Sequence, residues 1–447
     1  MKFGETDYEI KIWNGEKLNK YVVIDTETEV VPFIHTPRCV TIQAFDGGKD
    51  VFYVPLEKAK QFFELHKLHH LIMHNAPFDM DVLSKLMDDK GFMYSRYDAN
   101  LVRDTGVLYK LLHLAQHGFV PFKYNLKLLT EKYLGVVIEK DERRENFAQF
   151  LGKDIGDIPQ EYLEYGAGDV IATFFVYQTL MGLISNHDRM GTLLSHDIQV
   201  KGEIALQHIY KNGIGFDLLK RDEWLKDVDY KMGIEADILA SWGWVRGLKG
   251  INDKYEQIIK LLGLEDKLPK TKDGKISSAS DDLKHFRLKF PFIDAYLKYQ
   301  ELEKASSFVR NIESSRVHPR YSSIMNTGRT SCSKPNIQQL PRVGGVREMF
   351  KPVSEDNVFI DIDYSSLELA TLAQVNYTKF GESKMGDLIN GGKCLHYYTA
   401  SSVYNKPEAQ ITKDERQFAK IPNFGFGANM SPSTFVSYCA GMGVDID

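Results

Sequence analysis

Residues 22–29 read "VVIDTETE", an apolar run followed at once by acidic residues. The apolar run 22–24 is typical of a buried strand, and two carboxylates follow at Asp25 and Glu27. Alternation along a strand places side chains at i and i+2 on one face. Like charges that close repel, and partial burial raises the free energy of ionising them. We expect a divalent cation to balance the pair; for these two residues alone, a solvated strand end is the alternative.

The segments on either side predict an α/β domain. Two strands follow the opening stretch and are joined by the turn "DGGKD". A helix at 158–184 places Tyr165 and Asp169 four residues apart, so that both lie on one face. The remaining expected elements are strands at 20–30, 39–45, 50–56 and 71–75, a helix from 79 that ends near Gly91, and a helical stripe over 98–113.

Composition indicates a globular chain of two or three domains. Its 447 residues are 43% hydrophobic and 12% aromatic. The four cysteines lie far apart without a C-x-x-C pair, which favours a reducing, cytoplasmic setting without zinc. No run of apolar residues approaches 18, and the N-terminus lacks a signal-peptide core, so we expect no membrane association. The net charge of −5 does not by itself indicate nucleic-acid binding, although a basic cleft can exist in an acidic protein.

Three short motifs in order carry a family resemblance. They are D-x-E in "IDTETE" (Asp25, Glu27), N-x-x-F-D in "HNAPFD" (Asn75, Asp79) and Y-x-x-x-D in "YGAGD" (Tyr165, Asp169). Together they resemble the DEDD 3′→5′ exonuclease domain, tyrosine subclass, of family A DNA polymerases. The resemblance implies an RNase H-like α/β domain that removes 3′-terminal nucleotides in proofreading during DNA replication.

The resemblance also implies a metal centre. Cleaving a phosphodiester requires stabilising charge on an attacking water and a departing oxygen, and two divalent ions about 4 Å apart do both. Magnesium prefers oxygen ligands, so carboxylates from several elements must converge. By resemblance, Asp25, Glu27, Asp79 and Asp169 hold two Mg²⁺ ions, with Mn²⁺ as the alternative metal. Tyr165 orients the water, and Asn75 contacts DNA.

Two other features of this part have simpler interpretations. The histidines 66, 69, 70 and 74 lack a partnering ligand set, so we expect a solvated helix end and no metal cluster. Asp104 matches a family position before the third motif, but helix N-terminal capping explains it equally well.

The second half resembles the polymerase region of the same family. A helix that stops at Gly213, with Asp217 after it, resembles the opening of that region. The loop "KTKDGK" followed by an amphipathic helix resembles the thumb, and a solvated loop is the alternative. The stretch "MNTGRTSCSKPNIQQLPR" resembles a primer-template contact segment. Its implied DNA-binding residues are Arg329, Asn336, Gln338 and Gln339.

Motif A is matched by "VFIDIDYSSLELATLAQ", where we expect a strand to end at Asp363 and a helix to follow directly. The resemblance implies that Asp363 is catalytic and binds Mg²⁺, with the Tyr364 carbonyl as a further ligand. Glu368 takes the position of a steric gate against the ribose 2′-hydroxyl.

Motif B is matched by "KDERQFAKIPNFGFGANM", in which Arg416, Lys420 and Phe424 have the spacing of one helical stripe. With His396, they form the implied nucleotide-binding set. Ala428 and Asn429 replace a tyrosine and a glycine of the family pattern, and Pro422 should kink the helix. These departures concern fidelity and closure geometry.

The sequence continues to "YCAGMGVDID" without the histidine–aspartate turn that the resemblance implies for motif C. Three alternatives follow: half of a split polymerase of phage type completed by a second polypeptide, a truncated polymerase, or a standalone exonuclease that uses the polymerase remnant as a DNA-binding platform.

The predicted architecture is an α/β exonuclease domain followed by a mostly helical thumb and an incomplete α+β palm and fingers. The expected substrates are single-stranded 3′ ends, primer-template DNA and dNTPs, and the expected location is the cytoplasm, of a host cell if the gene is phage-encoded. The expected boundaries are 1–190 for the exonuclease, 191–320 for the thumb, 321–380 for the palm and 381–447 for the fingers.

Overall fold

The computed structural model describes residues 1–138, 142, 146–186 and 189–441. The chain divides into two compact units. The first is Met1–Arg221 with Phe308–Ser354, and the second is Asp222–Ser307 with Glu355–Asp447.

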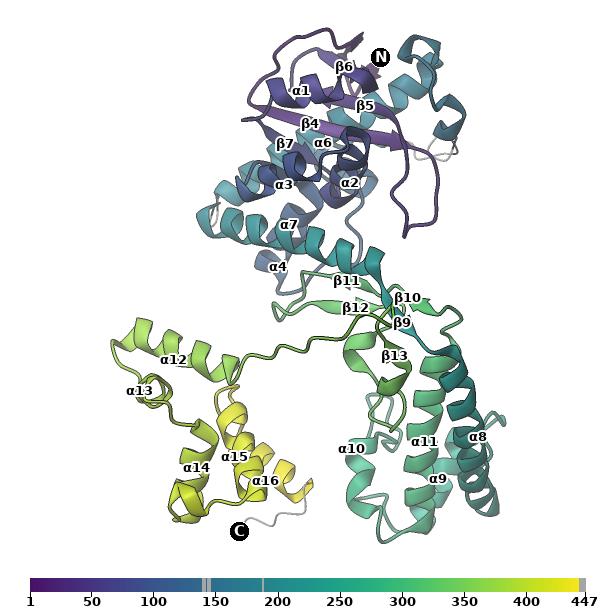
Figure 1. The fold of residues 1–447 in the computed structure, drawn as a ribbon. Coiled ribbons are helices and arrows are strands. Elements are labelled where there is room, and N and C mark those ends of the chain that lie inside the picture. Colours follow the sequence, from purple (N-terminus) through teal and green to yellow (C-terminus); the bar gives the residue numbers. More distant parts are fainter. Residues whose placement is uncertain (139–141, 143–145, 187–188, 442–447) are drawn as a thin grey trace. The chain divides into compact units, whose positions relative to one another are not determined.

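A six-stranded mixed sheet with the order β3-β6-β5-β4-β7-β8 forms the centre of the first unit (Figure 1). β4 pairs antiparallel with β5, whereas β4, β7 and β8 run parallel, so their carboxyl ends meet at one edge. The strands are β3 (Glu9–Ile12), β4 (Tyr21–Thr28), β5 (Cys39–Phe45), β6 (Asp50–Val54), β7 (His70–Met73) and β8 (Val102–Asp104), preceded by the hairpin β1 (Lys2–Phe3) and β2 (Thr6–Asp7).

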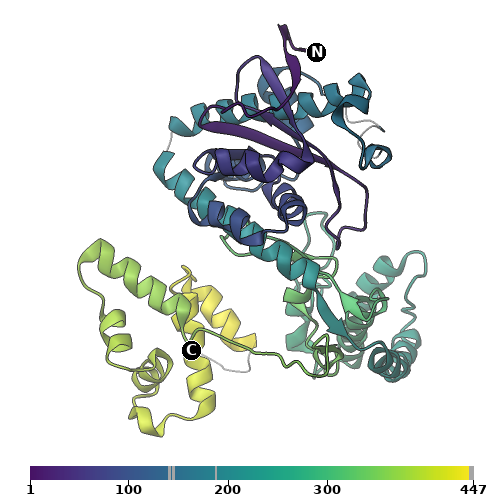
Figure 2. The same ribbon diagram turned by 45° about the horizontal axis from the view of Figure 1, so that its top comes forward.

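Helices cover both faces of this sheet because the side chains of each strand alternate between two cores. Val22 and Ile24 pack in one core, and Val23 packs in the other. Figures 1 and 2 show α1 and α2 on one side of the strands and the long α6 on the other. The first face carries α1 (Ala59–Leu65), α2 (Ala76–Met87) and α3 (Lys90–Asp98), and the second carries α4 (Thr105–His117), α5 (Leu126–Leu134) and α6 (Gln160–Ser185).

The helix α6 is long and apolar enough to cross a membrane by length and composition. However, 67% of its most apolar 18-residue window is buried inside the unit, against the sheet, α4 and α5. It therefore packs as the core helix of an α/β domain.

Three elements of this domain differ from those expected from the sequence. Residues 102–104 form a strand where a helical stripe was expected, because they pair with β7 before the helix starts at Thr105. The helix α2 ends at Met87, before Asp88 with its left-handed φ of 50°, and a separate helix α3 contains Gly91. The N-terminal strands β1 to β3 were not predicted.

The rest of the first unit joins this domain to a small sheet. The helix α7 (Arg189–Asn212) stops at Gly213, whose φ of 63° is left-handed and where a Cβ would stand 2.6 Å from the Val317 carbonyl oxygen. The expected glycine stop is confirmed. The sheet β10-β9-β13 follows, with β9 (Ile214–Phe216), β10 (Arg316–Val317) and β13 (Phe350–Lys351), beside the hairpin β11 (Arg320–Ser322) and β12 (Ser331–Ser333).

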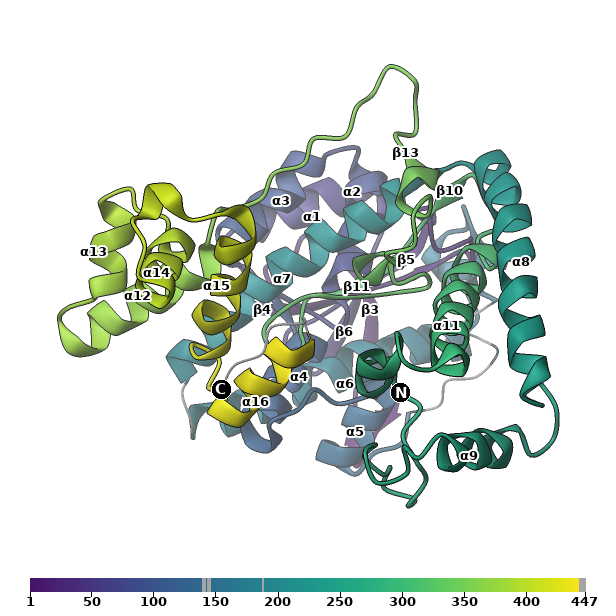
Figure 3. The ribbon, with the colours of Figure 1, turned by 90° about the horizontal axis from the view of Figure 1, so that it is seen from below.

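The second unit is built of helices, as predicted (Figure 3). One apolar cluster joins α8 (Leu218–Ser241), α9 (Ile251–Leu261), α10 (Ser280–Leu283) and α11 (Pro291–Arg310). The C-terminal helices are α12 (Leu367–Phe380), α13 (Lys384–Asn390), α14 (Leu395–Tyr404), α15 (Lys413–Gly425) and α16 (Pro432–Gly441).

The strand expected to end at Asp363 does not form. Residues 357–364 are irregular, and the apolar side chains of Val358, Ile360 and Ile362 are about four-fifths exposed, at 79%, 80% and 81%. A strand is stable only when a neighbouring strand pairs its backbone, and among the described residues none pairs with this segment. The helix expected directly afterwards begins at Leu367.

Candidate active site

Because side chains alternate along β4, its two carboxylates lie on the same face of the strand. Asp25 and Glu27 share a face with Val23 and point toward α6, which carries Asp169. One carboxylate oxygen from each of the three lies within 4.8 Å of the other two. Glu27 and Asp169 are buried and Asp25 is half-buried, so three negative charges converge in a poorly hydrated site.

Close approach of α6 to the sheet makes this convergence feasible. At Gly166, a Cβ would stand 2.5 Å from Gln43 Nε2 and 2.7 Å from Tyr53 Oη, so only glycine fits without a shift. Gln43 is the cross-strand partner of Asp25, and the Tyr53 hydroxyl donates to the Leu163 carbonyl oxygen of α6 at 2.6 Å. Sequence reasoning missed these three residues, although Gly166 lies inside the quoted motif "YGAGD" and the alternation of 39–45 points Gln43 to this face.

Tyr165 lies one helical turn from Asp169 and is 8% exposed. Its ring packs near Phe147, with centroids 6.1 Å apart. The predicted pair therefore shares one helix, as its spacing requires.

Asp79 occupies the opposite face of β4. The parity of the strand places Thr26 there, and Asp79 Oδ1 accepts from Thr26 N at 3.0 Å and Thr26 Oγ1 at 2.8 Å. Burial raises the pKa of Asp79 to about 7, although the hydrogen bonds from Thr26 lower it. Burial also raises the pKa of the Cys39 thiol, and the nearby charges of Asp79, Glu27 and Asp25 raise it further. Thus Asp79 lies at the same end of the sheet as the three-carboxylate group but is not a member of it.

Asp104 holds the start of two helices. Its Oδ1 accepts from Gly106 N at 2.8 Å and Val107 N at 3.1 Å, which caps α4, while its Oδ2 accepts from Ala76 N at 2.7 Å at the first residue of α2. Asn75, the predicted DNA contact, precedes that residue with a left-handed φ of 71°. The capping interpretation of Asp104 is confirmed, and the bond to α2 adds a role in placing Asn75 and Asp79.

The helix α7 supports this arrangement. The buried His196 accepts from Asp104 N through Nε2 at 2.9 Å, and its Nδ1 lies 3.1 Å from Asp197 Oδ1. Asp197 also pairs with Arg103 Nη1 at 2.5 Å.

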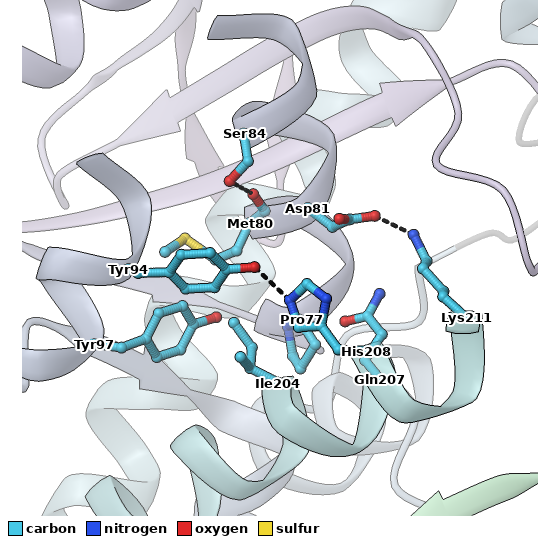
Figure 4. Close-up of a pocket in the computed structure, with 10 residues that line it drawn as sticks. All are labelled: Pro77, Met80, Asp81, Ser84, Tyr94, Tyr97, Ile204, Gln207, His208 and Lys211. Atoms are coloured by element: carbon cyan, nitrogen blue, oxygen red, sulfur yellow. Dashed lines mark hydrogen bonds and ion pairs between the residues drawn. The ribbon is translucent and has the colours of Figure 1, made fainter. Parts of the chain in front are cut away.

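Figure 4 shows a small cavity where α7 meets α2 and α3. Two contacts cross it, an ion pair of Asp81 with Lys211 and a hydrogen bond of Tyr94 with His208. The hydroxyl of Tyr97 also lies there, buried and without a hydrogen-bond partner among the described residues. The polar contacts fix α7 against the helix that carries Asp79.

The histidine cluster is not a solvated helix end. His66 is fully buried; its Nε2 accepts from Leu18 N at 3.0 Å and its Nδ1 lies 2.8 Å from the Phe62 carbonyl oxygen. Burial lowers the pKa of His70 to about 4. In the part of the chain that the structure describes, no ligand group of three includes these histidines.

In the second unit, α14 and α15 bring together four of the predicted nucleotide-binding residues. The rings of His396 and Phe424 lie 5.4 Å apart, and burial and the charges of Arg416 and Lys420 lower the pKa of His396. Arg416 also lies over the ring of Tyr397 at 5.2 Å. The helix α15 continues through Pro422, after an N-terminal capping box of Thr412 and Glu415.

The motif A residues are all exposed. Asp363 and Tyr364 are exposed in the irregular segment, and Glu368 is exposed in the first turn of α12. Asn429 adopts a φ of 63°, which is the left-handed region that glycine favours and that asparagine tolerates. Asn429 therefore holds a backbone conformation that glycine would also adopt.

The predicted DNA-binding residues lie on both sides of β12 in the first unit, with Arg329 before the strand and the other three after it. Arg329, Gln338 and Gln339 are exposed, and Asn336 is half-buried. Gln338 Nε2 donates to Thr330 Oγ1 at 2.8 Å, so the segment folds back on itself.

Known proteins resemble both parts of the chain. Residues 5–185 match the family described as "3'-5' exonuclease", and residues 251–439 match "DNA polymerase family A". The DNA polymerase I of Borreliella burgdorferi is 27% identical over 93% of this chain and 45% of its own length, and that of Aquifex aeolicus is 25% identical over 95% and 71%. The chain thus spans less than half of the first relative.

A solved structure shares the fold. The POL domain of Pol1 from M. smegmatis, in complex with DNA primer-template and dNTP, superposes with a TM-score of 0.68. It is 16% identical, and the match covers 95% of this chain and 70% of that one.

Proposed function

Because the chain belongs to DNA polymerase family A and carries the family's 3′-5′ exonuclease domain, we propose that it hydrolyses DNA from the 3′ end at Asp25, Glu27 and Asp169. The observation that carries this proposal is the convergence of these carboxylates within 4.8 Å on β4 and α6. Carboxylates this close repel one another when ionised, and a bound cation would balance their charge.

The donor set fits magnesium, with manganese as the alternative, because every ligand is a carboxylate oxygen. Asp25, Glu27 and Asp169 would hold the metal, with Asp79 joining from the other face of β4. When bound, the metal supplies charge stabilisation for the attacking water and the departing oxygen.

Two side chains of the protein would position the reacting water and the DNA. Tyr165 positions the water from the turn of α6 before Asp169, and Asn75 contacts the terminal nucleotide from the start of α2. Water forms the new bond to phosphorus, the bond from phosphorus to the 3′ oxygen breaks, and that oxygen leaves with a proton as a hydroxyl. The products are a nucleoside 5′-monophosphate and a shortened strand.

A 5′-labelled single strand with Mg²⁺ tests the proposal. We expect the full chain to shorten the strand stepwise and Asp25→Ala to lower the rate by about 100-fold or more, since a metal contributes several kcal/mol of transition-state stabilisation. Asp50→Ala is the matched control, because Asp50 lies on the same sheet but pairs with Lys11 at the surface. Equal rates for wild type and Asp25→Ala would overturn the assignment.

We further propose that the second part serves DNA synthesis. His396, Arg416, Lys420 and Phe424 would bind a dNTP, because a cationic pair suits a triphosphate and a ring suits a base. Asp363 and the Tyr364 carbonyl would hold a catalytic metal, and Glu368 would exclude ribose. Arg329, Asn336, Gln338 and Gln339 would contact primer-template DNA. The proposal includes a cytoplasmic location and four domains: the exonuclease at 1–190, the thumb at 191–320, the palm at 321–380 and the fingers at 381–447.

A standalone exonuclease is the second candidate, favoured by the exposed, irregular segment around Asp363. Primer extension separates the two. Lengthening of an annealed primer with dNTPs, by this chain alone or after addition of a second polypeptide, supports a polymerase. Shortening under every condition supports the standalone exonuclease.

A further inference from the structure

Residues 118–125, the loop between α4 and α5, expose three aromatic side chains. Phe122 is 99% exposed, Phe119 47% and Tyr124 41%. Phe119 stands against His113, with ring centroids 4.9 Å apart, and Tyr124 carries Lys110 Nζ over its ring at 4.4 Å. These contacts fix the rings of Phe119 and Tyr124, whereas the ring of Phe122 lies in water, where exposure of an apolar side chain is unfavourable. The Phe122 ring is therefore available to a ligand.

The chain that forms this loop and its flanks carries charge of one sign, although Lys110 also pairs with Glu203 of α7 at 3.7 Å. Residues 105–130 contain Lys110, Lys123 and Lys127 and no aspartate or glutamate, in a chain whose net charge is −5. Lys123 and Lys127 are exposed. Aromatic rings interleaved with cations bind single-stranded nucleic acid, because bases stack on the rings while lysines meet phosphates.

The loop lies between the candidate nuclease site and the predicted DNA-binding segment. On one side, a Cβ at Gly106 would stand 3.7 Å from both Tyr124 Cδ2 and His74 Cε1, and His74 directly precedes Asn75. On the other side, Val120 N donates to Asn326 Oδ1 at 2.8 Å, three residues before Arg329. All of these residues belong to the first unit, in which Figures 1 and 3 label α4 and β11.

We propose that residues 118–125 form a stacking platform for single-stranded DNA whose 3′ end lies at the carboxylates. Phe122 supplies the principal stacking surface, Phe119 and Tyr124 flank it, and Lys123 binds a phosphate. This inference rests on the proposed exonuclease, and it adds a binding surface that none of the three motifs contains.

Binding of labelled oligodeoxythymidylates of increasing length to the full chain, in EDTA to prevent hydrolysis, tests the platform. For strands long enough to reach the loop, we expect Phe122→Ala to weaken affinity about 5- to 100-fold, the range for one stacked base. Dinucleotide affinity should not change. Phe122→Trp should retain wild-type affinity, and Lys123→Gln should reduce the salt dependence by roughly one phosphate contact.

Leu68→Ala is the matched control. Leu68 is 73% exposed and precedes β7, so it lies at the edge of the sheet opposite to the carboxylates. Wild-type affinity of Phe122→Ala at every length would overturn the platform. A change in self-association of Phe122→Ala without a change in DNA affinity would overturn it in favour of contact between two copies of the chain.

Hydrolysis of a small aryl ester of thymidine monophosphate, with Mg²⁺, separates this inference from the proposed function. The ester is too short to reach the loop, so Phe122→Ala should cleave it at the wild-type rate while its KM for long single strands rises. If wild type cleaves neither ester nor DNA, the proposed exonuclease fails, and the length-dependent binding still decides the platform.

Discussion

Burial changes the acid–base behaviour of the Asp79 carboxyl group. It is 2% exposed, and the two hydrogen bonds from Thr26 do not offset its burial. As a result, its pKa rises from 3.8 to about 7. Its neighbours across β4, Asp25 and Glu27, lie on the face of α6.

The raised pKa of Asp79 makes stability depend on pH. Between about pH 4 and 7 the folded state binds more protons than the unfolded state, so the free energy of unfolding decreases as pH rises through this window. We expect Asp79→Asn to remove this decrease, on the order of a few kcal/mol, and to match wild type below pH 4. Urea unfolding in EDTA from pH 4 to 8 measures it.

Asp98→Asn serves as the control, because Asp98 is exposed at the end of α3 and should leave the pH profile unchanged. Parallel profiles for wild type and Asp79→Asn would show that Asp79 is ionised in the folded protein throughout.

Gly166 sets the distance between α6 and the sheet. We expect Gly166→Ala to destabilise the protein by about 1–3 kcal/mol, because the new methyl group would overlap Gln43 and Tyr53. The displaced helix would carry Tyr165 and Asp169 away from Asp25, so 3′ hydrolysis should also fall.

Gly182→Ala is its matched control on the same helix. A Cβ there meets nothing within 4 Å, and the gain in helix propensity should stabilise the protein by up to about 1 kcal/mol. Chemical denaturation and nuclease assays of both variants measure these effects. An unchanged nuclease rate for Gly166→Ala would show that Gly166 does not set the distance between α6 and the sheet.

At the scale of elements, the site depends on helices that meet at Asp104. The Asp104 carboxylate caps α4 and accepts from the first residue of α2, and the Asp104 backbone N–H donates to His196 on α7. Asp104 therefore links α4 and α7 to α2, the helix that carries Asp79.

Asp104→Ala would leave the amides of Ala76, Gly106 and Val107 buried without their acceptor. We expect a loss of roughly 2–4 kcal/mol, the combined effect of a lost cap and unsatisfied donors. Asp104→Asn retains one acceptor oxygen and should lose less. Denaturation and amide hydrogen exchange at Ala76 measure the effect.

Asn125→Ala provides the comparison, since Asn125 caps only α5 through Leu128 N. We expect a loss of about 1 kcal/mol, with amide protection at Ala76 retained. Equal losses for Asp104→Ala and Asn125→Ala would show that the bond to α2 contributes nothing.

At the scale of the molecule, the two units carry different proposed chemistries. Asp25, Asp79 and Asp169 belong to the first, and Asp363 and the group around His396 belong to the second. Each unit has its own apolar clusters, so unfolding of the whole chain need not be a single transition.

Asp363→Ala should therefore leave hydrolysis of single strands within about twofold of wild type, because Asp363 belongs to a different unit from the three carboxylates and residues without shared partners act independently. Any primer extension should be lost. A single-strand assay beside a primer-template assay tests both halves, with Asp356→Ala as an exposed carboxylate control from the same segment. A large loss of single-strand hydrolysis in Asp363→Ala would show that the units are coupled.

The sequence by itself determined the elements that local patterns encode. Alternation at 22–27, helical spacing at Tyr165 and Asp169, and the glycine stop at 213 each depend on neighbours within a few residues, and each is present in the fold. The family also followed from the sequence, because three motifs in order are rare by chance.

Tertiary structure decided what distant segments do to one another. It paired 102–104 with β7, buried His66, placed Gly166 against Gln43, and joined Asp104 to α2 and α7. It also left 357–364 without a strand, although its sequence alternates as a strand should. Local periodicity specifies which face a side chain takes, whereas pairing, burial and pKa depend on the partner that the fold brings to that face.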